Sequence, residues 1–98
     1  HFESGDRERA RSDAGRIARF LVGEGARRVV GIGSAFDARR SFTHRSDIDL
    51  VVEGIDAGEF YAISARAAAM TGFRLDLTPL EAATPALQRV AREEGVEL

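Results

Sequence analysis

The spacing of apolar positions divides the chain into helical and extended segments. Over residues 6–24, apolar side chains recur at intervals of four, three and four, which is the period of an amphipathic helix. Gly23 and Gly25 are suited to end that helix. Residues 27–32 follow with a Val-Val-Gly-Ile run, which is typical of a buried strand. We interpret Gly31 in this run as a packing residue.

A second extended segment, residues 47–53, alternates acidic and apolar positions. Because successive side chains of a strand point to opposite faces, Asp47 and Asp49 share one face and the apolar residues occupy the other. Residues 73–78 alternate in the same way, with Asp76 opposite their apolar side chains. If the two strands are neighbours in one sheet, three carboxylates converge on a surface that cannot be core.

Turn and cap signals separate these segments. Ser34 is expected to cap a short helical turn that runs through Arg39. Residues 41–46 form a polar loop before the acidic strand. Asp56 with Glu59 three residues later resembles a capping box, which predicts a helix after them.

The last third of the chain continues the alternation of helices and strands. Tyr61 lies in the helix that begins near residue 60, and we expect it to be half-buried. Thr84 and Pro85 predict the start of a final helix, with threonine at the N-cap and proline in the first turn. Gly95 ends that helix, and residues 96–98 are expected to add a short edge strand. This order of elements predicts an α/β (α+β) fold.

The length of 98 residues predicts one domain, residues 1–98, that buries about 65% of its unfolded surface. We give residues 1–5 no role and expect them to be a tag remnant or disordered. The chain has no cysteine, which excludes a disulfide framework, a thiolate zinc site and a cysteine nucleophile. Its two histidines, His1 and His44, are too few for a histidine-built metal site.

Charge and hydropathy narrow the function further. All fourteen basic residues are arginine, so no lysine can bind phosphate or form a Schiff base. A net charge of −2 gives no general attraction for DNA or RNA, whereas a small nucleotide needs only a local site. No apolar run reaches the roughly 20 residues that span a bilayer, and no signal peptide opens the chain, so we expect a cytoplasmic protein with no membrane partner.

The acidic strands and the glycine-serine step predict a common chemistry. Crowded carboxylates resist ionising unless a positive charge lies between them, and a set of oxygen ligands favours Mg²⁺ or Mn²⁺. Gly33 allows the backbone to approach a phosphate closely, and Ser34 can bind phosphate oxygens. The combination predicts a metal-dependent nucleotidyl-transfer site.

The ordered set of motifs resembles a known superfamily. Gly33-Ser34, the strand around Asp47 and Asp49, and the later Asp76 resemble the nucleotidyltransferases that include DNA polymerase beta and kanamycin nucleotidyltransferase. The short chain is similar to the minimal nucleotidyltransferase (MNT) subgroup, and in particular to its antitoxins. The resemblance covers residues 17–98 and implies a single nucleotidyltransferase-fold domain, a small mixed β-sheet with helices packed on one face.

This resemblance also assigns roles to residues. It implies that Asp47 and Asp49 hold two Mg²⁺ or Mn²⁺ ions, and that Asp76 completes the metal site and assists deprotonation of the acceptor hydroxyl. ATP is then the substrate, with its phosphates bound by Gly33 and Ser34.

One segment departs from the superfamily pattern. Many relatives carry an Ala-Arg-Gly step soon after Gly-Ser, where this chain has Ala-Phe-Asp-Ala-Arg-Arg. We expect Arg39 to replace the usual phosphate-side arginine, while Asp37 adds negative charge near the triphosphate path. Arg39, Arg40, His44 and Arg45 form a basic loop that is either solvated or in contact with nucleotide or partner.

The resemblance implies transfer of AMP from ATP onto a hydroxyl, expected to be a tyrosine of a HEPN-type toxin. We expect a second chain either to form the acceptor side of the site or to be the acceptor itself, because 98 residues leave no room for an added domain. A homo-oligomer is a further option. A small-molecule acceptor such as an aminoglycoside is disfavoured, since it needs enclosing walls. Two alternatives stay open: an antitoxin that only masks its partner, and a degenerate domain that senses nucleotide.

Overall fold

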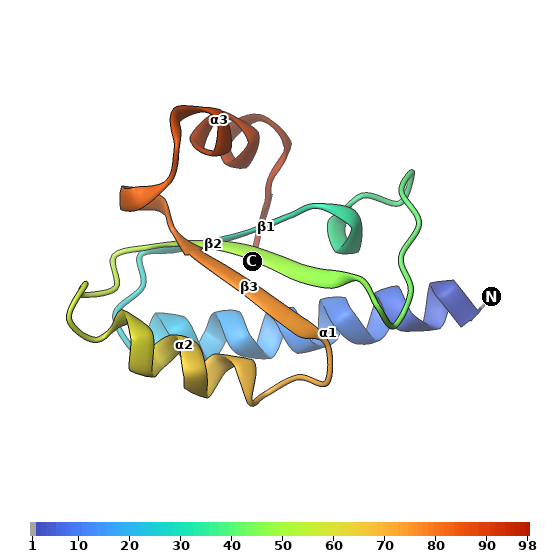
Figure 1. The fold of residues 1–98 in the computed structure, drawn as a ribbon, viewed down its shortest axis with the longest axis horizontal. Coiled ribbons are helices and arrows are strands. Elements are labelled where there is room, and N and C mark those ends of the chain that lie inside the picture. Colours follow the sequence, from blue (N-terminus) through green and yellow to red (C-terminus); the bar gives the residue numbers. More distant parts are fainter. Residues whose placement is uncertain (1) are drawn as a thin grey trace.

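The computed structural model describes residues 2–98 (Figure 1). Side chains are described from residue 5 onward. Part of the expectation for residues 1–5 concerns His1, which lies outside the residues that the structure describes. The elements in chain order are helix α1 (Phe2–Gly23), strand β1 (Arg28–Ile32), the 3₁₀ turn η1 (Ser34–Phe36), strand β2 (Asp47–Glu53), helix α2 (Phe60–Ala68), strand β3 (Arg74–Pro79), the 3₁₀ turn η2 (Leu80–Ala82), helix α3 (Pro85–Glu94) and strand β4 (Val96–Glu97).

The strands form one mixed sheet in the order β3-β2-β1-β4. β1 pairs antiparallel with β2 and with β4, whereas β2 and β3 are parallel. The parallel pair requires a crossover, and α2 supplies it between the two strands. The mixed sheet and the α+β class predicted from the sequence are confirmed.

Helices cover both faces of the sheet (Figure 1). α1 and α2 pack on one face, where they bury apolar side chains of the strands, including Val29, Ile48, Leu50 and Val52. α3 packs on the other face, where Ala91 contacts Val30 and Val51. The prediction that the helices lie on one face is therefore correct for α1 and α2 and wrong for α3. Each of β1 and β2 contains two consecutive buried valines, Val29 with Val30 and Val51 with Val52. Consecutive residues of a strand face opposite sides, so both faces of the sheet must be covered.

Three cap predictions have different outcomes. Thr84 caps α3 as predicted, and its Oγ1 accepts a hydrogen bond of 3.1 Å from the N–H of Leu87. The capping box is wrong, because Asp56 accepts instead from the N–H of Gly58, and Glu59 makes no side-chain cap at α2. The residue at the N-cap of η1 is Gly33, so Ser34 begins that turn rather than capping it.

Two aromatic residues anchor the segment after β1. A Cβ atom on Gly31 would lie 2.5 Å from the ring of Phe36, which confirms that Gly31 is a packing residue. Phe42 is fully buried in the core, although the sequence suggested only a polar loop there.

Tyr61 is more exposed than the sequence predicted. It is 87% exposed on α2, not half-buried. Among the helices that the structure describes, none is long and apolar enough to cross a membrane.

Candidate active site

Two of the predicted carboxylates lie at the same level of the sheet. The parallel register of β2 and β3 places Asp49 opposite Asp76, and Asp47 opposite Arg74. Neighbouring strands are about 4.8 Å apart, so the side chains of Asp49 and Asp76 rise next to each other. Ile48 and Leu50 point into the core below, which directs Asp47 and Asp49 to the face that carries α3.

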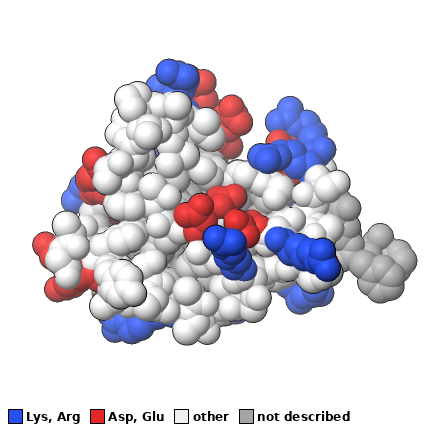
Figure 2. All heavy atoms as spheres, viewed as in Figure 1, with Lys and Arg blue, Asp and Glu red and all other residues white. Residues whose placement is uncertain are grey.

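The acidic residues form a patch on the part of this face that α3 does not cover. Figure 2 shows acidic atoms gathered over the middle of β2 and β3, with basic atoms next to them. Within residues 5–98, none of Asp47, Asp49 and Asp76 forms an ion pair. A surface salt bridge between Asp76 and a neighbour such as Arg74 is therefore not what accounts for the third carboxylate.

Electrostatic repulsion within the patch acts on Asp49. Burial raises the pKa of Asp49, and the negative charges of Asp76 and then of Asp47 raise it further. The charge of Arg40 acts in the opposite direction and lowers this pKa. The patch as it stands is therefore short of positive charge, which is the condition that a divalent cation relieves.

The residues fit a hard cation by their chemistry. Their side chains offer only carboxylate oxygens, the ligands that Mg²⁺ and Mn²⁺ prefer. In the described part of the chain, however, no three His, Cys, Asp or Glu side chains are already close enough together to hold one metal ion. The structure thus brings Asp49 and Asp76 together directly, with Asp47 one step away along the same strand face.

Gly33 joins this patch to the loop that follows β1. Its φ of +80° is a conformation that side chains rarely adopt, and a Cβ atom there would lie 2.6 Å from Oδ2 of Asp49. Only glycine therefore allows the loop to pass next to Asp49. Ser34 follows at the start of η1, so both residues of the predicted phosphate step lie beside the carboxylate patch.

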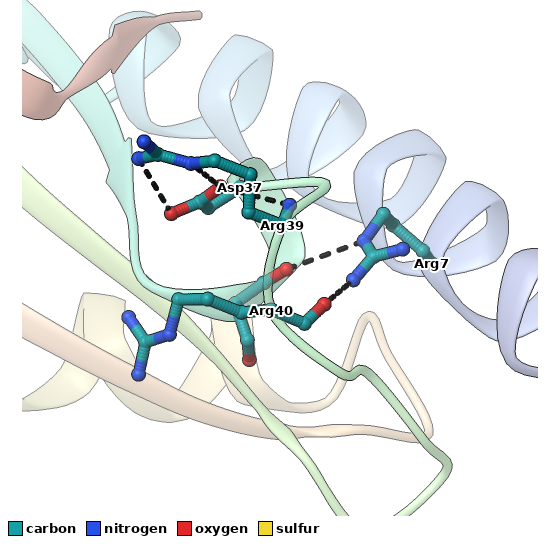
Figure 3. Close-up of polar contacts among 5 residues, drawn as sticks. Arg7, Asp37, Arg39 and Arg40 are labelled. Atoms are coloured by element: carbon teal, nitrogen blue, oxygen red, sulfur yellow. Dashed lines mark hydrogen bonds and ion pairs between the residues drawn. The ribbon is translucent and has the colours of Figure 1, made fainter.

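Arg39 is engaged by its own loop (Figure 3). Its Nε and Nη2 donate to the two carboxylate oxygens of Asp37 at 3.0 and 3.1 Å, and its backbone N–H donates to Oδ1 at 3.0 Å. These hydrogen bonds lower the pKa of Asp37 to about 2. Asp37 thus neutralises the guanidinium that was expected to bind phosphate.

Arg40 has a role that the sequence did not single out. It is the basic residue whose charge acts on Asp49, and its side chain points away from Arg7 (Figure 3). Its carbonyl oxygen accepts a hydrogen bond from Nη2 of Arg7, while Nε of Arg7 donates to the carbonyl of Ser34 at 3.3 Å. Nothing local in the sequence distinguishes Arg40 from the other arginines of the basic loop, since α1 determines its placement.

A cleft of about 290 Å³ lies between this loop and α3. The loop side contributes Gly33, Asp37, Arg39 and Arg40. The helix side contributes Val90, Glu93 and Glu94, which the sequence did not indicate as site residues. The cleft meets the carboxylate patch at Gly33, so a ligand bound there can reach Asp49. Its volume is at the lower end for small-molecule sites.

Comparison with known proteins finds similarity in the fold but none in the family models or curated sequences. Neither the models of known protein families nor the curated protein sequences contain a match to the chain. Solved structures do match, and one of a proposed minimal nucleotidyltransferase has a TM-score of 0.76 at 24% identity, covering 95% of this chain and 96% of that chain.

Two matching structures are complexes. A toxin–antitoxin structure with AMP-PNP contains a chain that is 19% identical, with a TM-score of 0.71, covering 86% of this chain and 70% of that chain. The complex of an MNT antitoxin with tri-AMPylated Shewanella oneidensis HEPN toxin contains a chain that is 18% identical, with a TM-score of 0.66, covering 90% and 70%. At these identities the likeness establishes a shared fold.

Proposed function

We propose that this domain is a metal-dependent nucleotidyltransferase that moves AMP from ATP onto a hydroxyl group of a partner protein. The observation that carries the proposal is the position of Asp49 directly opposite Asp76, with Asp47 on the same face and Gly33 against Asp49. A fold shared with minimal nucleotidyltransferase structures supports it.

The carboxylates have distinct tasks in this reaction. Asp47 and Asp49 would hold two divalent cations, and Asp76 would complete the site. The bound cations would supply neutralisation of the triphosphate and stabilisation of the leaving pyrophosphate. Asp76, which is exposed on β3, can accept the proton of the acceptor hydroxyl as the oxygen attacks the α-phosphate.

The loop after β1 serves the phosphates. Gly33 removes the steric barrier between the loop and the carboxylates, and Ser34 offers a hydroxyl. Arg40 supplies positive charge on this side, since its charge lowers the pKa of Asp49. Asp37 engages two of the five side-chain N–H donors of Arg39 and offsets the charge of its guanidinium, which weakens the attraction of Arg39 for phosphate.

The shape of the site favours a side chain of another protein as the acceptor. A cleft of about 290 Å³ is at the lower end for small-molecule sites, so it leaves no room for a second small molecule beside a nucleotide, and the carboxylates lie outside it on an exposed part of the sheet. An acceptor hydroxyl must therefore approach from solvent, and a protruding tyrosine can do so. The complexes with HEPN toxins support a toxin of this type as the partner.

Labelled ATP tests the proposal. The wild-type domain is incubated with α-labelled ATP, Mg²⁺ and the product of the neighbouring open reading frame as the candidate partner, and AMP on that protein is measured by mass spectrometry. We expect modification that disappears in EDTA and in the Asp47→Ala/Asp49→Ala variant, while the complex persists. Glu59→Gln, which removes an exposed carboxylate far from the site, is the matched control. Unmodified partner under all conditions would refute the proposal.

The masking and sensing alternatives are supported by one observation, the Asp37–Arg39 pair, which removes a cation from the phosphate side of the cleft. A masking antitoxin would neutralise its partner equally well with Asp47 and Asp49 replaced by alanine. A sensor would bind ATP without forming pyrophosphate. The same assay, with neutralisation and pyrophosphate release recorded in parallel, separates the three functions.

A further inference from the structure

Two arginines of α1 reach the loop from below the cleft. Arg7 bridges two carbonyl oxygens, with Nε on that of Ser34 and Nη2 on that of Arg40 (Figure 3). Arg11 donates from Nε to the carbonyl of Ala35 at 2.7 Å. Three carbonyls between residues 34 and 40 are thus bound to one helix that lies more than twenty positions earlier in the chain.

The helix geometry makes this possible. Arg7 and Arg11 are four residues apart, so their side chains project from the same face of α1. Each guanidinium also lies 6.0 Å from the centre of an aromatic ring, Arg7 over Phe42 and Arg11 over Phe36. Because Phe42 is fully buried and Phe36 packs against Gly31, each guanidinium lies between an anchored aromatic ring and the loop, although Arg11 as a whole is exposed.

These bonds determine how the loop peptides are oriented. The carbonyl and the N–H of one trans peptide point in opposite directions. A carbonyl of Ser34 that faces α1 therefore turns the N–H of Ala35 away from the helix, and the carbonyl of Arg40 does the same for the N–H of Ser41. The loop that carries Gly33 and Arg40 is held in this conformation from both ends.

We infer that Arg7 and Arg11 are positioning residues for the nucleotide: they hold residues 33–40 in the conformation that binds the phosphates. This inference rests on the proposed function, since ATP with Mg²⁺ is the ligand. Neither arginine lines the cleft, so each acts through the loop and not by contact with ATP. Misplacing such a loop by about 1 Å can cost a large factor in rate or affinity.

The two arginines differ in how a lysine would replace them. Arg7 bridges two carbonyls from two separate nitrogens of its rigid planar guanidinium. A lysine ammonium has three donors on one nitrogen, so it would have to draw both carbonyls toward a single point. Arg11 makes one such bond, which an ammonium can reproduce. If charge alone mattered, both lysine variants would behave like the wild type.

Hydrogen–deuterium exchange and calorimetry test the inference together. Exchange of the peptide that covers residues 33–41 is measured in the metal-free protein, and the Kd for ATP is measured with Mg²⁺. We expect Arg7→Gln to speed exchange in this peptide and to weaken ATP binding by about tenfold. Arg7→Lys should remain impaired, whereas Arg11→Lys should restore what Arg11→Gln loses.

Arg16→Gln is the matched control, because Arg16 lies on the same helix and its side-chain hydrogen bonds within the described part of the chain go to Ser12 and Asp13 of that helix. Circular dichroism verifies that each variant is folded. If a glutamine variant does not fold, the lysine variants decide whether Arg7 and Arg11 position the loop. Unchanged loop exchange in Arg7→Gln, or full rescue by Arg7→Lys, would overturn the inference. Absence of ATP binding by the wild type would refute the proposed function instead, and the exchange data would still decide the role of Arg7.

Discussion

The carboxylate of Asp49 occupies the space that a side chain on residue 33 would need. A Cβ atom on Gly33 would lie 2.6 Å from Oδ2 of Asp49, and the backbone there has φ of +80°. The loop after β1 and the acidic strand β2 are therefore in contact at the point where phosphate and metal would meet.

Gly33→Ala should for this reason reduce both stability and function. The strained backbone predicts a loss of about 1–3 kcal/mol in the free energy of unfolding, and displacement of Asp49 should abolish most nucleotidyl transfer. Gly72→Ala is the control, because a Cβ atom there meets nothing within 4 Å. Chemical denaturation and the transfer assay measure the two effects. A Gly33→Ala variant as active as Gly72→Ala would contradict the proposed contact.

Asp49→Asn should stabilise the metal-free protein while it removes the function. Burial and the charges of Asp76 and Asp47 raise the pKa of Asp49 in the folded state. A group with a raised folded-state pKa stabilises the fold while it is protonated, and this contribution is lost as the pH rises through that pKa. At neutral pH the amide, which carries no charge, should therefore raise the Tm by a few degrees.

The measurement is a series of thermal melts from pH 4 to pH 8 in EDTA. The difference between Asp49→Asn and the wild type should grow with pH, while Glu59→Gln should show no such trend. Added Mg²⁺ and ATP should then stabilise the wild type and leave Asp49→Asn unchanged. A variant that is less stable than the wild type at every pH would show that Asp49 is not under electrostatic strain.

Asp37→Ala should strengthen ATP binding by releasing Arg39. The gain should be modest, about two- to fivefold, because exposed ion pairs contribute little. The hydrogen bonds from Arg39 lower the pKa of Asp37 to about 2. The ion pair is therefore fully formed at any pH above the ordinary pKa of an aspartate, and it is lost as the pH falls through about 2. The gain in ATP affinity of Asp37→Ala should therefore not change with pH in assays near neutral pH.

A double-mutant cycle with Arg39→Ala tests this interpretation by calorimetry. The gain in Asp37→Ala should disappear when Arg39 is also alanine. Weaker ATP binding in Asp37→Ala would mean that the aspartate holds Arg39 in a productive position.

Asp76→Asn should separate binding from chemistry. Removal of a general base slows transfer by about 10²–10⁴-fold while ground-state binding changes little. Single-turnover transfer and calorimetric ATP binding should thus diverge, with the Kd within a few-fold of the wild type. Because Asp76 faces Asp49 in register, a large loss of binding would show instead that its main task is to hold the cation.

The local sequence determined the parts that depend on periodicity and on single residues. The alternation in β2 placed Asp47 and Asp49 on one face, because side chains of any strand alternate. Thr84 and the proline after it determined where α3 begins. The need for glycine at residue 33 was visible as well, although its steric cause, Asp49, was not.

Only the tertiary structure decided which segments meet. The register that places Asp76 opposite Asp49 depends on how α2 packs the crossover between two strands. The bonds from Arg7 to the loop join positions 27 and 33 residues apart, and the partner of such a side chain has no local signature. A short sequence pattern predicts which face of a strand or helix a residue occupies. Long-range packing determines which segment lies opposite that face.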